Sequence, residues 1–233
     1  MRDGKRARHL MIRAGVSLLA VALCGCVDYE ERVELNPDGK TGLLKIHLAV
    51  DERFVAVKWP KVTGSSIESI FPTTLEDIRK EMNSPALELV DARASVSAPM
   101  RHLYLVCRIK DVGKLNESPA LAHRAFTFKQ DSPTTWTCQQ QLDITGTNIL
   151  GSTPEQTAKA LTDMETKYGR DNIRGILSKY RLTLSVSMPE DVAAQTPNGA
   201  VHGGSTVIWQ KSLTQLLYSK EPWKMEAHFA KER

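Results

Sequence analysis

The sequence predicts an α+β fold, a mainly antiparallel sheet of about seven to nine strands with two helices covering one face. Most of the chain alternates apolar and polar residues with the period of two that is typical of half-buried strands. Two segments instead combine the spacing of a helical face with the residues that start helices. No internal repeat and no long linker divides the sequence, so residues 26–233 are expected to form one domain.

A hairpin opens this domain. Residues 29–35 and 43–50 are strand-like, and the residues between them include Asn36-Pro37-Asp38-Gly39, a run of turn formers. In the second arm every second residue from Leu44 to Val50 is apolar. The same alternation predicts further strands at 86–97, 101–110, 124–130, 134–144, 180–188 and 205–210, and a last strand from about Trp223 to Phe229.

Two helices are expected between these strands. Thr73 and Glu76 have the spacing of a capping box and predict a helix to about Asn83. Pro154 at a first helical position predicts a second helix that continues toward Tyr168 and ends at Gly169. Segments 53–72 and 195–204 are expected to be loops because proline and glycine interrupt them, and a brief helical turn is expected near residues 213–217.

The N-terminus has the features of a secretory signal. Five basic residues precede an apolar run of ten residues, Ala14 to Leu23, which is about half the length that crosses a bilayer as a helix. The run ends in Leu23-Cys24-Gly25-Cys26, which resembles the lipobox of bacterial lipoproteins. The resemblance implies that residues 1–25 are a signal peptide and that Cys26 carries the lipid. Cys24 departs from the family, which usually has a smaller residue there.

The implied location is the cell envelope, with the protein held to a membrane through acyl chains, such as palmitate, on Cys26. Val27 follows the anchor cysteine, so the aspartate that resembles an inner-membrane retention signal is absent at that position, although Asp28 comes next. This favours the outer membrane or the periplasmic face.

Removal of the signal peptide changes the charge balance. The formal net charge is +4 for the whole sequence, but residues 1–25 hold five basic residues and one acidic residue, which leaves 26 of each kind in the mature chain. A chain without net positive charge gives no electrostatic reason to bind nucleic acid.

Two cysteines remain beyond the lipobox, Cys107 and Cys138. Both fall on the apolar side of predicted strands, so we expect them to be neighbours on one sheet. Two readings stay open, a disulfide formed in an oxidising compartment and two buried free thiols.

Motifs of catalysis and metal binding are missing from the sequence. It contains no zinc-binding histidine pair on a predicted helix, no serine-hydrolase elbow and no phosphate-binding loop. No metal and no cofactor is therefore expected, and histidines such as His47, His102 and His228 are read as exposed surface residues. Trp59, in irregular chain beside Pro60, is the tryptophan that we expect at a ligand or partner contact.

Two stretches, Val33 to Gly39 and Gly203 to Trp209, resemble a family of small bacterial lipoproteins of uncharacterised activity. The favoured function is a lipid-anchored, non-enzymatic binding or scaffolding module of the envelope, and the partner is expected to be an envelope protein or a lipid ligand. Two alternatives remain, a carrier of a hydrophobic or lipid ligand and a hydrolase with an unrecognised site.

Overall fold

The computed structural model describes residues 27–52, 62–71, 73–118, 121, 124–142, 154–219 and 221–231. The signal sequence, Cys26 and Trp59 lie outside these residues, and the predictions made for them stay predictions.

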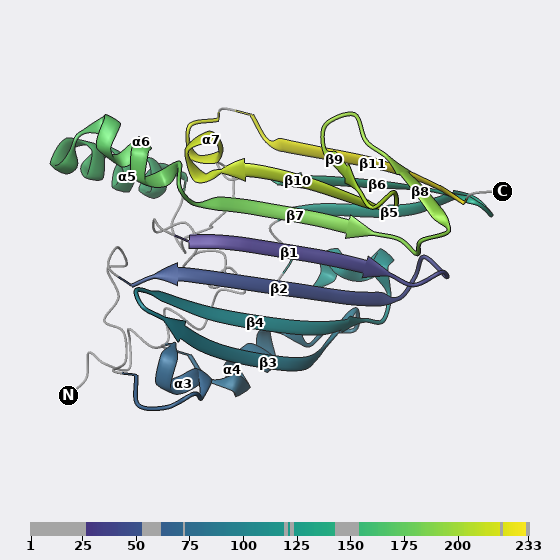
Figure 1. Cartoon of the computed structure of the whole chain (residues 1–233), viewed down its shortest axis with the longest axis horizontal. Helices are drawn as coiled ribbons and strands as arrows, with labels where there is room; N and C mark the ends of the chain where they lie inside the picture. The colour runs from purple at the N-terminus through teal and green to yellow at the C-terminus, as the bar shows by residue number, and fades with distance from the viewer. Residues whose placement is uncertain are drawn as a thin grey trace.

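Eleven strands of the described chain form two sheets, with helices at their margins (Figure 1). This confirms the α+β class. The larger sheet has the order β3 (Leu87–Ser97), β4 (Met100–Ile109), β2 (Gly42–Asp51), β1 (Val27–Leu35), β7 (Arg181–Ser187), β10 (Thr206–Ser212) and β9 (Ala200–His202). The smaller sheet has the order β5 (Arg124–Ser132), β6 (Thr135–Leu142), β11 (Trp223–Lys231) and β8 (Val192–Gln195).

The N-terminal strand β1 lies in the middle of the larger sheet. It pairs antiparallel with β2, its neighbour in sequence, and parallel with β7, which follows more than 140 residues later. All other pairings in both sheets are antiparallel.

The strand directions give the larger sheet two ends. One end, called here the Val27 end, contains the start of β1, the β3–β4 turn and the start of β7. The opposite Leu35 end contains the end of β1 and the β1–β2 turn. In that turn Gly39 has φ +62°, and a Cβ atom there would lie 2.7 Å from Nε1 of Trp136 on the other sheet. Glycine thus allows the hairpin to lie against the smaller sheet.

One hydrophobic cluster fills the space between the sheets. Alternate residues of β1, β2, β4, β7 and β10 meet alternate residues of β5, β6 and β11, which is why the period-two pattern located the core side of each strand. The largest fully buried side chains of the cluster are Trp209 and Phe229.

The helices lie around this core. α3 (Ile67–Ile70) and α4 (Leu75–Met82) pack against β3, and α3 lies within a segment expected to be loop. The cap of α4 is Thr74, which accepts a hydrogen bond from the Asp77 backbone, so the Thr73–Glu76 cap was wrong by one residue. A short 3-10 helix, Val112–Glu117, connects β4 toward β5.

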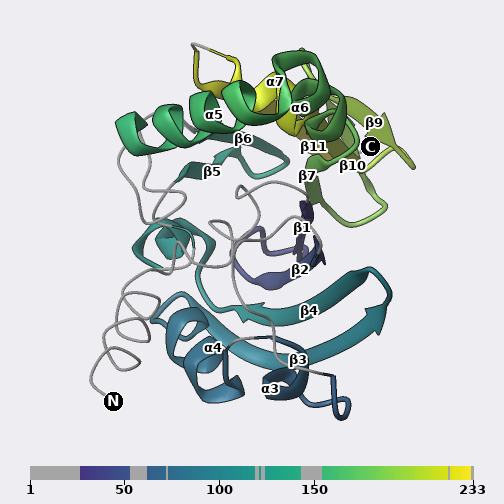
Figure 2. The ribbon, with the colours of Figure 1, turned by 90° about the vertical axis from the view of Figure 1, so that its left-hand side faces the viewer.

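Three helices, α5 (Pro154–Tyr168), α6 (Arg170–Leu177) and α7 (Leu213–Leu217), lie at the Val27 end, where Figure 2 shows them above the sheets. Gly169 ends α5 as predicted, but its φ of +85° turns the chain directly into α6, which the sequence analysis missed. α7 confirms the expected helical turn. None of the described helices is both long and apolar enough to cross a membrane.

A buried arginine joins α3 to the Val27 end of the larger sheet. Arg101, at the start of β4, has a side chain only 5% exposed, and its guanidinium contacts Oε2 of Glu52 through Nε at 2.7 Å and Nη2 at 2.6 Å. Its Nη1 donates to the carbonyl of Ile70 in α3 at 2.5 Å. The guanidinium thus contacts both Glu52 and α3 from strand β4 through separate nitrogen atoms, which a single ammonium group could not do.

Candidate functional site

The outer face of the larger sheet is open to solvent. Figure 1 looks onto this face, and none of the described helices crosses it in that view. A row of polar side chains, one from each of six adjacent strands, runs across it because each residue is the cross-strand neighbour of the next. We call this the outer-face row, and it consists of Arg93, Tyr104, His47, Glu30, Thr183 and Gln210.

Aromatic and imidazole rings stack in the middle of this row. The rings of His47 and Tyr104 are nearly parallel, with centroids 4.3 Å apart and an interplanar angle of 5°. His102, one diagonal position away, lies 5.4 Å from the His47 ring, measured between centroids. Stacking of this kind restricts the side chains to one arrangement, so the row presents a preorganised surface.

A chain of hydrogen bonds links the two histidines to the end of β3. Nε2 of His47 lies 3.1 Å from Nδ1 of His102, and Nε2 of His102 lies 2.7 Å from the Ser97 hydroxyl. Burial lowers the pKa of His47, the charge of His102 lowers it further, and Glu30 and Asp28 oppose this shift. The net lowering favours a neutral imidazole, which can donate through one nitrogen and accept through the other.

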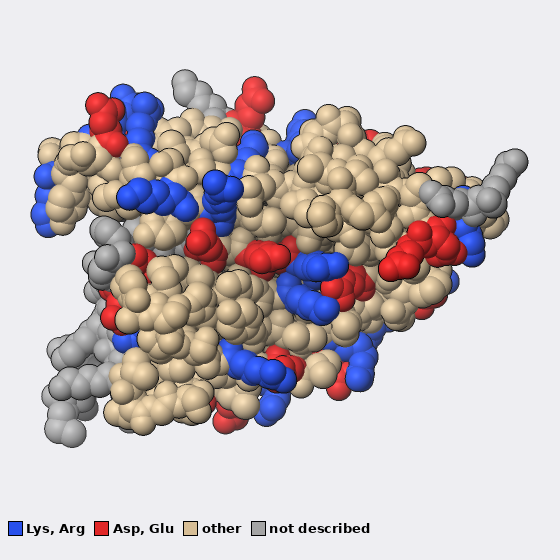
Figure 3. Space-filling view, in the orientation of Figure 1, with Lys and Arg blue, Asp and Glu red and all other residues tan. Residues whose placement is uncertain are grey.

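Two carboxylates beside the stack have no basic partner among the described side chains. Glu30 forms no ion pair there, and Asp28 accepts a hydrogen bond from the backbone of Arg181 at 2.8 Å. Glu34, further along β1, instead forms ion pairs with Arg32 at 3.0 Å and Lys45 at 2.7 Å. Figure 3 shows acidic side chains across the middle of this face, with Lys and Arg side chains among them. This part of the face thus offers negative charge and hydrogen-bond acceptors.

Ser97, His102 and His47 stand in the order of nucleophile, base and orienting group that some hydrolases use. Ser97 is exposed at the end of a strand on an open sheet face. A hydrolase would need a water-excluded site with donors for the developing oxyanion at such a serine, so the arrangement fits surface hydrogen bonding better.

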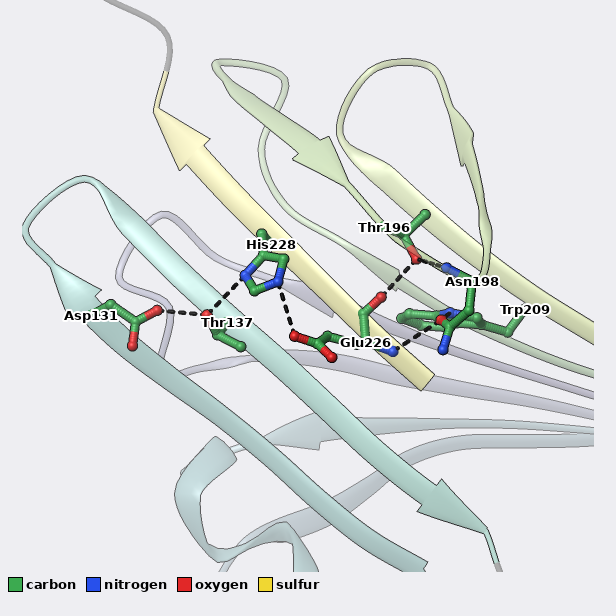
Figure 4. Close-up of polar contacts among 7 residues, drawn as sticks. All are labelled: Asp131, Thr137, Thr196, Asn198, Trp209, Glu226 and His228. Atoms are coloured by element: carbon green, nitrogen blue, oxygen red, sulfur yellow. Dashed lines mark hydrogen bonds and ion pairs between the residues drawn. The ribbon is translucent and has the colours of Figure 1, made fainter. Parts of the chain in front are cut away.

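A second polar network lies on the outer face of the smaller sheet (Figure 4). His228 is held on both sides, with Nε2 3.0 Å from Oε1 of Glu226 and Nδ1 3.2 Å from Oγ1 of Thr137, which donates to Asp131 at 2.6 Å. Both ring nitrogens already have partners, so this network is closed on itself. The alternate residues of β6 on this side are polar and at least partly exposed.

Next to this network, the Asn198 side chain forms hydrogen bonds to both sheets (Figure 4). Its Oδ1 accepts from Trp209 Nε1 at 3.0 Å, and its Nδ2 donates to the Lys224 carbonyl at 3.1 Å. The expectation that 195–204 is only a loop was therefore wrong. The segment contains β9, and its start is tied to both sheets by side-chain hydrogen bonds that turn composition does not reveal.

The structure separates the two cysteines that were expected on one sheet. Cys107 lies on β4 of the larger sheet and Cys138 on β6 of the smaller one, and both side chains are buried. Burial and the charge of Glu31 raise the pKa of Cys107 to about 12. The sheet assignment was wrong because alternation shows which side of a strand faces the core, whereas two sheets share that core.

The sequence analysis missed the outer-face row as a site. His47 and His102 are 55 residues apart, and the pairing of β2 with β4 brings them together. The detectable signal was that both fall on the polar side of their strands. The described residues contain no group of three or more histidine, cysteine or acidic side chains placed to hold a metal ion.

Comparison with known proteins gave no family assignment. No family model and no curated protein matches the chain. Among solved structures it is similar to the folded domain of LppM from Mycobacterium tuberculosis, with 12% identity, coverage of 89% of this chain and 91% of that one, and a TM-score of 0.43. It is also similar to an M1 zinc metallopeptidase from Deinococcus radiodurans, with 9% identity, coverage of 88% and 42%, and a TM-score of 0.31.

Proposed function

We propose that this protein is a bacterial lipoprotein, held to an envelope membrane by acyl chains on Cys26, that binds an envelope protein without catalysing a reaction. The observation that carries the binding role is the outer-face row, in which a stacked pair of rings lies beside carboxylates that form no ion pair with any described residue. Tyrosine, histidine and arginine on an uncovered, preorganised surface are typical of protein interfaces.

The chemistry of the row defines the partner. Asp28 and Glu30 favour a surface that brings basic side chains, and the neutral imidazole of His47 can both donate and accept hydrogen bonds. The continuous apolar cluster between the sheets supports binding through the surface rather than carriage of a ligand inside.

The anchor is tested by replacing Cys26 with serine. One acyl chain of myristoyl length binds membranes only marginally, whereas the two or three chains of a lipoprotein hold a protein firmly. The variant should lose incorporation of an alkyne-labelled fatty acid and leave the membrane fraction or accumulate as precursor. Unchanged acylation and retention would contradict the assignment.

The binding role is tested by photo-crosslinking in the native host. A photoreactive amino acid at Tyr104 should give one discrete crosslinked species that disappears when Glu30→Lys is added. The same amino acid at Thr137, on the outer face of the smaller sheet, is the control. Equal crosslinking from both positions, or none from Tyr104, would contradict the proposed face. Purified protein that hydrolysed ester, peptide or glycan substrates, with loss of turnover in Ser97→Ala, would instead identify an enzyme.

A further inference from the structure

We propose that the Val27 end of the molecule rests against the phospholipid bilayer, with the strands of the larger sheet directed away from the membrane. This inference rests on the proposed acylation of Cys26 and assigns an orientation and a lipid-contacting surface that acylation alone does not define.

The first reason is the length of the tether. Cys26 is the covalent neighbour of Val27, and Val27 is the first residue of β1. Consecutive Cα atoms are about 3.8 Å apart, so no spacer separates the acylated residue from the sheet. A lipid on Cys26 therefore places the start of β1 at the level of the headgroups.

The second reason is that the start of β1 is fixed within the fold. Val27 pairs with Val50 of β2, and from Tyr29 onward the strand also pairs with β7. Tyr29 is buried, and its hydroxyl donates to Oε2 of Glu31 at 2.8 Å. Lengthening the tether by detaching the start of β1 would break these contacts, so the whole Val27 end must approach the bilayer with its anchor.

The third reason is the chemistry of the corner formed by α5 and α6, which projects from this end (Figures 1 and 2). The two helices together hold four basic and four acidic residues, but the stretch from Lys167 to Arg181, which runs from the end of α5 to the start of β7, holds five basic residues and one acidic residue. Figure 3 shows Lys and Arg side chains around this corner. Tyr168 is exposed there with Lys167 Nζ 4.9 Å from its ring centroid. Exposed aromatic rings and basic side chains favour the headgroup region of a bilayer that contains anionic lipids.

The corner is held in a defined position relative to the sheet. The Tyr218 hydroxyl, just after α7, donates to Glu165 of α5, and Arg174 of α6 lies 4.5 Å from the Tyr218 ring centroid. Arg170 adds an ion pair with Glu165 at 3.5 Å. The corner and the start of β1 can thus contact the same bilayer together. In this orientation the outer-face row faces sideways and stays accessible.

The test uses the acylated full-length protein in vesicles of phosphatidylcholine and phosphatidylglycerol that carry a lipid-bound quencher. Single cysteines labelled with an environment-sensitive fluorophore replace Tyr168 and Val96 at the Val27 end. Matched controls replace Val90 and Val201, which lie toward the Leu35 end. The four side chains have similar exposure, 52% and 38% against 53% and 46%. Cys107 and Cys138 are buried, so the label reports the introduced cysteine.

We expect quenching and a blue-shifted emission at positions 168 and 96, and neither change at 90 and 201. Charge reversal by Lys167→Glu with Arg170→Glu should reduce the quenching at position 96 at least about fivefold in the anionic vesicles. The reason is that each basic residue near such a surface contributes measurably to membrane binding. Lys129→Glu, on the smaller sheet, is the matched charge control and should leave the quenching unchanged.

The outcomes separate this inference from the proposed function. Protein that floats with the vesicles but shows equal signals at all four positions would overturn the orientation and leave the anchor intact. Protein with intact Cys26 that does not float with the vesicles would overturn both. Equal quenching in neutral and anionic vesicles would overturn the role of the basic corner.

Discussion

Nε2 of His47 lies 3.1 Å from Nδ1 of His102, so the two rings share one proton, and a second proton between them would break the contact. This relationship ties the stability of the outer-face row to pH. The pKa of His47 in the folded protein lies below 6.5, first because of burial and then because of the charge of His102. The unfolded chain therefore binds this proton at higher pH than the folded chain does.

The stabilising contribution of neutral His47 should be complete above about pH 6.5 and decrease as the pH falls toward the lowered folded value. Urea unfolding at about pH 7.5 and about pH 5 should show a smaller free energy of unfolding at the lower pH. His47→Gln should reduce that difference, whereas His202→Gln, on the exposed β9, should not. A difference that is the same in His47→Gln and the unmodified protein would contradict this linkage.

The Gly39–Trp136 contact predicts different costs for two similar glycine substitutions. Gly39 and Gly203 have nearly the same φ, +62° and +59°, but a Cβ at Gly203 would meet nothing within 4 Å. Gly203→Ala should therefore cost about 1 kcal/mol for its positive φ. Gly39→Ala should cost about 2–4 kcal/mol, because overpacking against Trp136 adds to the same backbone strain. Denaturant unfolding measures both, and equal costs would show that Trp136 yields without penalty.

The two buried thiols should be unreactive in the folded protein. Because the pKa of Cys107 is about 12, almost no thiolate is present at neutral pH, and burial excludes the reagent as well. Iodoacetamide should label neither Cys107 nor Cys138 until the chain is unfolded, after which mass spectrometry should find two new adducts on the mature acylated protein. A disulfide between Cys107 and Cys138 would contradict the placement of the two cysteines on different sheets. A third adduct, on Cys26, would contradict the anchor.

Replacement by lysine should change the free energy of unfolding much more at Arg101 than at Arg108. Both lie on β4 and form an ion pair with a glutamate, but the Arg101 side chain is 5% exposed and that of Arg108 is 58% exposed. Arg101→Lys should destabilise the fold by about 1–3 kcal/mol, because the three donors of lysine sit on one nitrogen and cannot replace the three guanidinium nitrogens that contact Glu52 and the Ile70 carbonyl. Arg108→Lys should change stability by less than about 0.5 kcal/mol. Thermal unfolding of the two variants measures the contrast.

The sequence predicted single strands better than their assembly. The strand expected at 101–110 is β4, Met100–Ile109, and the one expected at 180–188 is β7, Arg181–Ser187. Alternating burial is a local property, so it is visible in the residues themselves. The pairing of β1 with β7 depends on contacts between distant residues, and nothing in the local pattern of either strand encodes it.

The same limit explains the errors at the candidate site. His47 and His102 were each placed on a polar strand face, but their contact depends on a register that only the assembled sheet defines. β9 was missed because its three residues are too few to show a period. α6 was missed because Gly169 was interpreted only as the end of one helix, whereas it also starts the next. Trp59 was chosen for its irregular surroundings, and it lies outside the described residues.

The central position of β1 has a consequence for the order in which the chain is made. Synthesis proceeds from the N-terminus, so β1, β2, β3 and β4 emerge first and can pair in the order β3-β4-β2-β1. The other edge of β1 must then wait until β7 emerges, more than 140 residues later. During that interval an unpaired strand edge with apolar side chains is open to pairing with other chains, a hazard for nascent proteins. The newly made chain should therefore need a holding chaperone mainly in the interval before β7 closes the sheet.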